Sequence, residues 1–494
     1  MKKLFFPLKY FPLQKINPTF NIALIAVIFC STHLIVSTEI ISLSVFANDS
    51  EIQEKFGNPN SWQFGAINAS LYIGSLFGEL IFHRWNLTLC RVEVFQLALL
   101  FWIIVSIVQI ANPFNYIQAF ITRFLKGLSF SAIKAVIYIY MVETFPQSVT
   151  FRLCNVLEHI QVFGLFLTYS ASTYIINHSH KERNFRLFSG IPLFYAGIIY
   201  ACSIYIPQSP FWLVSTGHYD KGEYIQNQFA HKYNTPEEYP LRNKVDLVDF
   251  FLNDIDSELK TSFTLKKIKL LLSSTMRVSC GVFIILFYSM LFNIMIDKND
   301  KSLGFIILFT TTAGFVISNT WFYDTNPNNK NRFTIFSALI CLFFIINIVN
   351  CILSRLAFEG DLVKENFLSG VLSLVLFECF FYPHIISSFP VVAKLEFLYE
   401  NRKSRVPIIC NQVETFLISL FLICTPILLT DSKLTWIFFL IPSCFTFLLL
   451  AISFIVYPIY RRRLNKNNHT MECPNAIDQN KYYGSDPIIL TETM

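Results

Sequence analysis

Residues 92–111 of the chain read VEVFQLALLFWIIVSIVQIA, a run of twenty residues that contains one charge, Glu93, and no proline. An α-helix of this length is about 30 Å long, which matches the hydrocarbon thickness of a bilayer. Comparable apolar runs recur along the whole chain. They lie at about 20–47, 63–82, 114–142, 153–177, 187–206, 276–296, 302–323, 333–353, 366–393, 406–430 and 434–460. The sequence therefore predicts an all-α membrane protein with twelve transmembrane helices.

The composition excludes most soluble classes of protein. Of 494 residues, 53% are apolar or aromatic and 15% are charged, whereas soluble domains have roughly 25% charged residues. The mean hydropathy is +0.48. The sequence shows no nucleotide-binding GxxxxGK[ST] loop, no cluster with metal-ligand spacing and no nucleophile elbow. We therefore expect no enzyme, no cofactor, no metal site and no nucleic-acid partner.

The apolar runs divide the chain into five parts. They are an N-terminal tail (1–19), a first six-helix half (20–207), a central loop (208–275), a second six-helix half (276–460) and a C-terminal tail (461–494). Both termini lie on one side because the number of spans is even. On that side the loops and tails contain 27 Lys and Arg residues, against 9 on the other side. The positive-inside rule makes it the cytoplasmic side.

The cellular setting follows from this topology. Two glycosylation sequons, at Asn48 and Asn177, fall on the outer side, and either could be a chance triplet in an Asn-rich chain. Together with cytoplasmic termini they favour the plasma membrane. The expected partners are the lipid bilayer, a small solute and protons, and we expect the chain to act as a monomer.

The two halves of the sequence resemble each other. Residues 158–163, EHIQVF, occupy the place in the fifth span that residues 411–416, NQVETF, occupy in the eleventh. Glu143 and Arg152, nine residues apart, correspond likewise to Glu396 and Arg405. Parallel repeats of six spans are typical of secondary transporters, whose substrate site lies at the membrane midplane between the halves.

Several motifs resemble those of the sugar porter branch of the major facilitator superfamily. Residues 207–213, PQSPFWL, are similar to the family's P-E-S-P-R-W-L, and residues 123–127, RFLKG, to its G-R-F-L-x-G. Residues 140–146, YMVETFP, are similar to Y-x-x-E-x-x-P. The seventh span departs from the family, since only Asn293 corresponds to Q-Q-x-x-G-x-N, and the terminal P-E-T-K-G is absent.

The resemblance implies the major facilitator fold and secondary transport of a small polar solute, a hexose above all, by alternating access. Glu158 stands where the family usually has a sugar-contacting Gln. The predicted solute site comprises Lys134, Glu158, Gln161, Asn293, His384, Asn411 and Glu414. The predicted cytoplasmic latch, which would gate the site, comprises Arg84, Glu143, Arg152, Glu396 and Arg405.

Charges inside the predicted spans are costly, and such groups usually face a cavity and a partner. In proton-coupled sugar porters a carboxylate of the first span faces the Arg of the fourth, and Glu39 and Arg123 have these places. Because an Arg partner favours the ionised carboxylate, loosening such a pair would let Glu39 load a proton. The alternative is a purely structural ion pair.

The cations of the fourth span leave the function open. Lys134 is predicted either to neutralise Glu158 or, together with Lys126 and Arg123, to attract an anionic solute. The alternatives to sugar uptake are therefore a transporter of an organic or phosphorylated anion, and a non-transporting nutrient sensor of the same fold.

Overall fold

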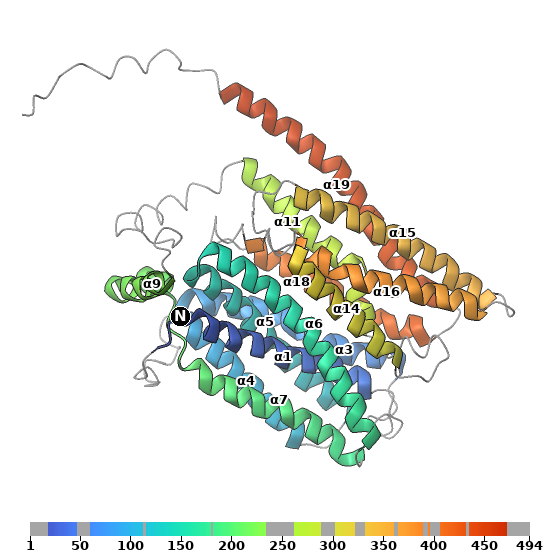
Figure 1. Ribbon diagram of the computed structural model, residues 1–494, viewed down its shortest axis with the longest axis horizontal. Coiled ribbons are helices and arrows are strands. Elements are labelled where there is room, and N and C mark those ends of the chain that lie inside the picture. The colour runs from blue at the N-terminus through green and yellow to red at the C-terminus, as the bar shows by residue number, and fades with distance from the viewer. Residues whose placement is uncertain are drawn as a thin grey trace, which may run out of the picture.

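The computed structural model describes residues 18–46, 60–111, 115–178, 181–233, 261–287, 302–321, 331–359, 364–388, 394–395, 406–430 and 434–471. Within these residues the regular secondary structure is helical throughout. The helices lie side by side as a bundle, with the first half in blue to green and the second in yellow to red (Figure 1).

Each half supplies six membrane spans. The first half contains α1 (Ile22–Phe46), α3 (Ser61–Thr88), α4 (Arg91–Ala111), α5 (Tyr116–Thr144), α6 (Gln147–His178) and α7 (Lys181–Ser203). The second contains α11 (Thr261–Ser279), α12 (Val282–Phe287), α14 (Ser302–Trp321), α15 (Asn331–Glu359), α16 (Lys364–Ser388), α18 (Val406–Thr430) and α19 (Thr435–Met471). Eight of them, α1, α3, α4, α5, α15, α16, α18 and α19, are long and apolar enough to cross a membrane by composition alone. The runs that contain α6, α7, α11–α12 and α14 complete the predicted twelve.

The seventh span differs from its predicted form. Its helix begins at Thr261, so the predicted boundary between residues 275 and 276 falls inside α11, where Ser273 and Ser274 are already buried. The span is then interrupted at Gly281, whose φ of +76° is a conformation that glycine adopts without steric cost. The described part of the span therefore comprises two helical segments, α11 and α12.

The internal repeat is visible in the helix packing. In the first half α3 packs on α5, α4 on both α5 and α7, and α1 on α6. In the second half α14 packs on α16, α15 on both α16 and α19, and α11 on α18, which is the same set of contacts six spans later. The halves meet along α3 and α18 and along α6 and α14, and these two seams are themselves related by the repeat.

Glycines set the closest helix crossings. A Cβ added to Gly74 of α3 would lie 2.0 Å from the carbonyl oxygen of Phe124 in α5, and one added to Gly127 of α5 would lie 2.0 Å from the carbonyl oxygen of Leu71. In the second half a Cβ on Gly314 of α14 would lie 2.1 Å from the carbonyl oxygen of Phe380 in α16. Absence of a side chain is what lets these backbones touch.

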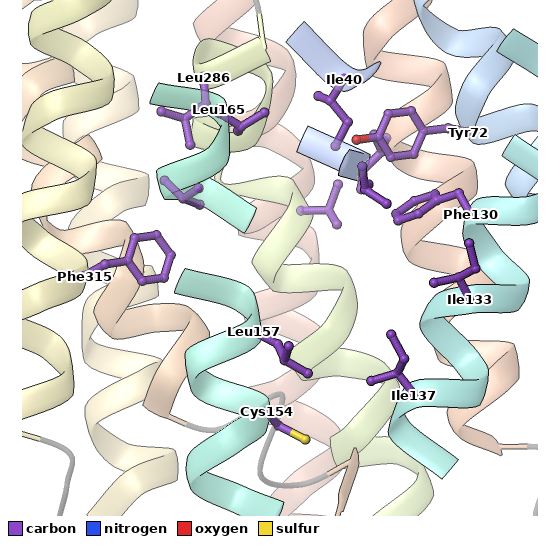
Figure 2. Packing of buried hydrophobic residues seen from close by; sticks show 14 of the residues in the cluster. Ile40, Tyr72, Phe130, Ile133, Ile137, Cys154, Leu157, Leu165, Leu286 and Phe315 are labelled. Atoms are coloured by element: carbon purple, nitrogen blue, oxygen red, sulfur yellow. The ribbon is translucent and has the colours of Figure 1, made fainter. Parts of the chain in front are cut away.

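Large apolar side chains fill the rest of the interior. Phe130, Ile133 and Ile137 follow one side of α5 and face the region of Leu157 on α6 (Figure 2). Aromatic contacts line the seam between α6 and α14, where the ring centroids of Phe166 and Phe305 are 5.0 Å apart. The bundle is therefore held mainly by packing of large apolar side chains, and glycines allow its closest helix crossings.

Between the halves two short helices follow α7. They are α8 (Pro210–Ser215) and α9 (Tyr219–Tyr233). Ser209 is the N-cap of α8 and its Oγ accepts a hydrogen bond from the Trp212 backbone N–H at 3.2 Å. Gly217, with φ of +87°, lies just after the C-terminal end of α8, the position where a left-handed residue commonly ends a helix.

Candidate functional site

A polar cavity lies between the two halves. Its lining comes from α3, α5 and α6 on one side and from α11, α12, α16 and α18 on the other. It offers about 100 Å³ to the centres of water molecules, and one water requires about 10–15 Å³ in that measure. Several waters, or a small polar solute in their place, therefore fit. The polar lining residues are Tyr72, Ser75, Glu79, Ser131, Lys134, Glu158, Gln161, Arg277, Tyr382, Asn411, Glu414 and Thr415.

On the first-half side the central group is Glu158 of α6. The Nζ of Lys134 in α5 lies 3.2 Å from its Oε1, and the hydroxyl of Tyr138 donates to the same oxygen at 2.8 Å. Gln161, one turn further along α6, also faces the cavity. Of the two roles foreseen for Lys134, the structure shows the pairing with Glu158.

On the second-half side the central group is Glu414 of α18. It is held by two cations, because Arg277 donates to its Oε2 at 2.6 Å and Lys394 to its Oε1 at 2.8 Å. Lys394 also donates to the side-chain oxygen of Asn411 at 2.8 Å. All three ionised groups are largely withdrawn from solvent, so the cluster satisfies its charges internally.

One hydrogen bond joins the two sides of the cavity. The Nδ2 of Asn411 in α18 donates to the Oε1 of Glu79 in α3 at 3.2 Å. Asn411 is oriented by Lys394 at its oxygen and by Glu79 at its nitrogen. It thus links the Glu414 cluster of the second half to a carboxylate of the first.

Glu39 of α1 forms a separate buried cluster within the first half. The Nζ of Lys126 lies 2.8 Å from its Oε2, and the Nη1 of Arg123 lies 3.8 Å from its Oε1. Lys126 also donates to the side-chain oxygen of Gln109 and lies 5.2 Å from the centroid of the Trp102 ring. Glu39 therefore has two cationic partners, and the nearer one is Lys126 rather than the predicted Arg123.

Glu143 closes a further polar cluster at the end of α5. Arg91 binds it through two nitrogens, with Nη2 to Oε1 at 2.8 Å and Nε to Oε2 at 3.1 Å. The Oγ of Ser209 donates to Oε2 at 2.6 Å, and the hydroxyl of Tyr140 donates to the Pro207 carbonyl oxygen at 2.9 Å. The segment 207–213 is in this way fastened to the end of the fourth span.

The family model described as "Sugar (and other) transporter" matches residues 21–469. The chain belongs to this family of transporters. The eight helices of the described residues that are long and apolar enough to cross a membrane fit a multi-pass membrane protein of this family.

Relatives of this transporter include a probable metabolite transport protein of Saccharomyces cerevisiae, 25% identical over 267 residues, which are 53% of this chain and 49% of that protein. A high-affinity glucose transporter of Candida albicans is 23% identical over 213 residues, 43% of this chain and 39% of that protein. The chain thus spans about half the length of the first relative and about two fifths of the second.

The solved structures establish the fold of the transporter. The xylose transporter XylE from E. coli, in a partially occluded inward-open conformation, matches with a TM-score of 0.65 and 14% identity over 87% of this chain and 98% of that one. A second structure, described as a major facilitator superfamily proton:xylose symporter, matches with a TM-score of 0.62 and 14% identity over 87% and 95%. The predicted major facilitator fold is confirmed.

The transporter brings most of the predicted solute site together. Lys134, Glu158, Gln161, Asn411 and Glu414 line one cavity. His384 of α16 does not belong to that lining and packs beside Phe381, with ring centroids 5.6 Å apart. Asn293 lies outside the described residues.

The predicted latch and glycosylation residues are less fully described. Arg84 lies near the end of α3 and Arg152 is exposed on α6. Glu396, Arg405 and Asn48 lie outside the described residues, and Asn177 is in the last turn of α6. For Glu143, a predicted latch residue, the structure describes an ion pair, and its cationic partner is Arg91.

Three charged residues of the transporter's cavity region were not assigned to the solute site from the sequence. Arg277 and Lys394 were counted as loop charges, and the structure places both in the polar cluster around Glu414. Glu79 was recognised as a charge within the second span but given no role. Helical spacing could have indicated a role for Glu79 in the site, because residues 72, 75 and 79 form one face of α3 and all three line the cavity.

Proposed function

We propose that this transporter moves a small polar solute, a sugar, across its membrane by alternating access. The observation that supports this most is the polar cavity, which is lined by both halves and lies between them. A solute held there would be released to either side as the halves rock about it. The relatives named as glucose and xylose transporters support a sugar as that solute.

The charge balance of the site favours a neutral solute over an anion. Each cation near the cavity already has a carboxylate partner, with Lys134 beside Glu158 and both Arg277 and Lys394 beside Glu414. Lys126 is similarly engaged by Glu39. An anion would have to displace a buried partner from one of these pairs, which is expensive. A sugar needs only hydrogen-bonding groups.

Uptake into proteoliposomes tests the proposal. The full-length protein should take up labelled D-glucose or D-xylose with saturable kinetics, and exclude organic and phosphorylated anions. Preferential uptake of an anion would favour the alternative transporter. A sensor of the same fold would bind a solute without carrying it, so binding without flux of any solute would refute transport.

We further propose that uptake is coupled to protons at Glu39. The Glu39→Gln substitution preserves the size of the side chain but removes the charge that Lys126 and Arg123 face. With an imposed inward proton gradient, the wild type should accumulate sugar above the external concentration and Glu39→Gln should not. Glu93→Gln, on the exposed side of α4, is the matched control and should accumulate as the wild type does. Equal accumulation by Glu39→Gln would leave Glu39 a structural role only.

We also propose a plasma-membrane location, cytoplasmic termini and a monomeric state, and the distribution of Lys and Arg supports the cytoplasmic termini. Cysteines introduced at Lys221 in α9 and Asn468 in α19, in a chain freed of native cysteines, should resist impermeant thiol reagents in intact cells. Labelling from outside would reverse the topology. Surface biotinylation would test the location, and light scattering in detergent would test the monomer.

A further inference from the structure

Glu79 is a buried carboxylate that the proposed mechanism does not yet use. It lies on α3, is 5% exposed and contributes to the cavity lining. The other two carboxylates of the cavity, Glu158 and Glu414, each have a cation within 3.2 Å. Among the described residues no Lys or Arg nitrogen lies within 4.0 Å of Glu79, whose partner is the Asn411 amide.

The two oxygens of Glu79 have different surroundings. Oε1 accepts the hydrogen bond from Asn411. Oε2 has no hydrogen-bond partner among the described residues. Protein atoms do not enclose it fully, whereas they do enclose the unpartnered Oε2 of Glu378. Since Glu79 lines the cavity and its Oε1 is engaged by Asn411, we infer that Oε2 faces the cavity interior. One oxygen is thus fixed by protein and the other is open to whatever fills the cavity.

The neighbours of Glu79 suit a solute with hydroxyl groups. Tyr72 and Ser75 lie on the same face of α3, and Ser131 of α5 faces the same space. A carboxylate accepts hydrogen bonds and donates none, so Oε2 selects a donor. A phosphate or carboxylate offered to it would meet like charge, whereas a sugar hydroxyl would form a charge-assisted hydrogen bond.

We propose that Glu79 binds the solute directly, accepting a sugar hydroxyl at Oε2, while Asn411 of the opposite half positions it through Oε1. This inference rests on the proposed sugar transport and names the group of the first half that recognises the sugar. The bound sugar then contacts Glu79 of the first half, and Glu79 in turn accepts the hydrogen bond from Asn411 of the second half. Asn411 is a positioning residue in this arrangement.

A substitution paired with deoxy sugars tests the assignment. The probes are labelled D-glucose and, as competitors, its monodeoxy analogues, each of which lacks one hydroxyl. In Glu79→Gln the amide oxygen can take the place of Oε1 and keep the hydrogen bond from Asn411, which leaves the NH2 group, a donor, at the place of Oε2. We expect this loss of the acceptor to raise KM for D-glucose about tenfold. One analogue should compete about tenfold less well than D-glucose on the wild type, yet as well as D-glucose on Glu79→Gln, because both changes remove the same hydrogen bond.

The outcomes separate this inference from the proposal beneath it. D-glucose uptake with an unchanged KM in Glu79→Gln, or losses that simply multiply for every analogue, would overturn the role of Glu79 alone. Absence of uptake of both D-glucose and D-xylose by the wild type would overturn sugar transport and this inference with it. Glu93→Gln serves as the control for loss of a carboxylate elsewhere. If Glu79→Gln does not reach the membrane, Glu79→Asp, which withdraws the carboxylate by one methylene, enters the same cycle.

Discussion

The fifth and eleventh spans present the same chemistry to the cavity in opposite order. In the first half Glu158 precedes Gln161, and in the second half Asn411 precedes Glu414, at equivalent places of the internal repeat. Each half therefore contributes one carboxylate and one amide, three residues apart on a helical face. The halves differ in how the carboxylate is neutralised, by one lysine in the first and by an arginine and a lysine in the second.

The difference shows how charges can be buried at a moving interface. Each of these ion pairs has both partners within one half, so rocking of the halves leaves them intact. Removing a partner from a buried ion pair costs about 3–5 kcal/mol. A single hydrogen bond to a charged group contributes about 1.5–3 kcal/mol, and the Asn411–Glu79 bond that joins the halves is of that kind. The ion pairs named here thus lie within the halves, and this hydrogen bond lies between them.

The largest expected effect concerns the second half. Glu414→Gln leaves Arg277 and Lys394 without their carboxylate, and it should lower the free energy of unfolding by about 3–5 kcal/mol. The Lys134 side chain is 26% exposed, so water can solvate it after Glu158→Gln, and the loss there should be smaller. Equilibrium unfolding of the purified protein by SDS in mixed micelles measures both. Equal losses would contradict the asymmetry between the halves.

A smaller effect is expected at the glycine crossings. Gly127→Ala places a methyl group against the Leu71 backbone, and Gly314→Ala places one against the Phe380 backbone. Overpacking of this kind should destabilise by about 1–3 kcal/mol. We expect the first-half crossing to lose more, because glycines of both its helices, Gly74 and Gly127, allow the contact.

Gly190 of α7 provides the matched control for these substitutions. A Cβ there would meet nothing within 4 Å, so Gly190→Ala should be neutral or stabilise by about 0.5–1 kcal/mol. The same SDS titration compares all three variants. Destabilisation by Gly190→Ala as large as that by Gly127→Ala would mean that the contact with Leu71 is not the cause.

The smallest expected effect concerns the Tyr138 hydroxyl, an uncharged donor that adds a hydrogen bond to the Glu158–Lys134 ion pair. Tyr138→Phe removes the hydroxyl that donates to Glu158 at 2.8 Å, while Lys134 keeps its place. The expected cost is about 1.5 kcal/mol, the low end for a hydrogen bond to a charged group, because Lys134 still pairs with Glu158. We expect a measurable but modest rise in KM for sugar. Tyr195→Phe, which removes a hydroxyl that donates to Ser31 away from the cavity, should leave KM unchanged. A KM that rises equally in both variants would deny Tyr138 a specific role.

The sequence predicted the membrane helices well because an apolar run of twenty residues has few alternatives in a bilayer. It also predicted that Glu158, Gln161, Asn411 and Glu414 converge, since the repeat places them equivalently on two helices that face the midplane. The partner of Glu39 was less predictable. Lys126 and Arg123 lie three residues apart on one stripe of α5, so helical spacing alone does not distinguish which of them is nearer to Glu39.

The seventh span contains a contact that the hydropathy pattern does not predict. Arg277 was counted with the charges in and beside the central loop, because it stands at the very start of the apolar run that begins at about residue 276. The helix itself begins fifteen residues earlier, at Thr261, and carries Arg277 inward to Glu414. Lys394 reaches the same carboxylate from the region between α16 and α18. Long-range ion pairs of this kind depend on tertiary packing, which hydropathy does not encode.

Both partners of each ion pair lie in the same half, and this affects how charge moves through the membrane field during transport. An elementary charge that crosses the membrane field gains or loses about 2.3 kcal/mol for every 100 mV. The Glu158–Lys134 pair moves with its half as a unit of zero net charge, so rocking displaces no elementary charge through that pair. A steady current during sugar uptake would then report an ion that travels with the sugar, and its size would count those ions for each sugar carried.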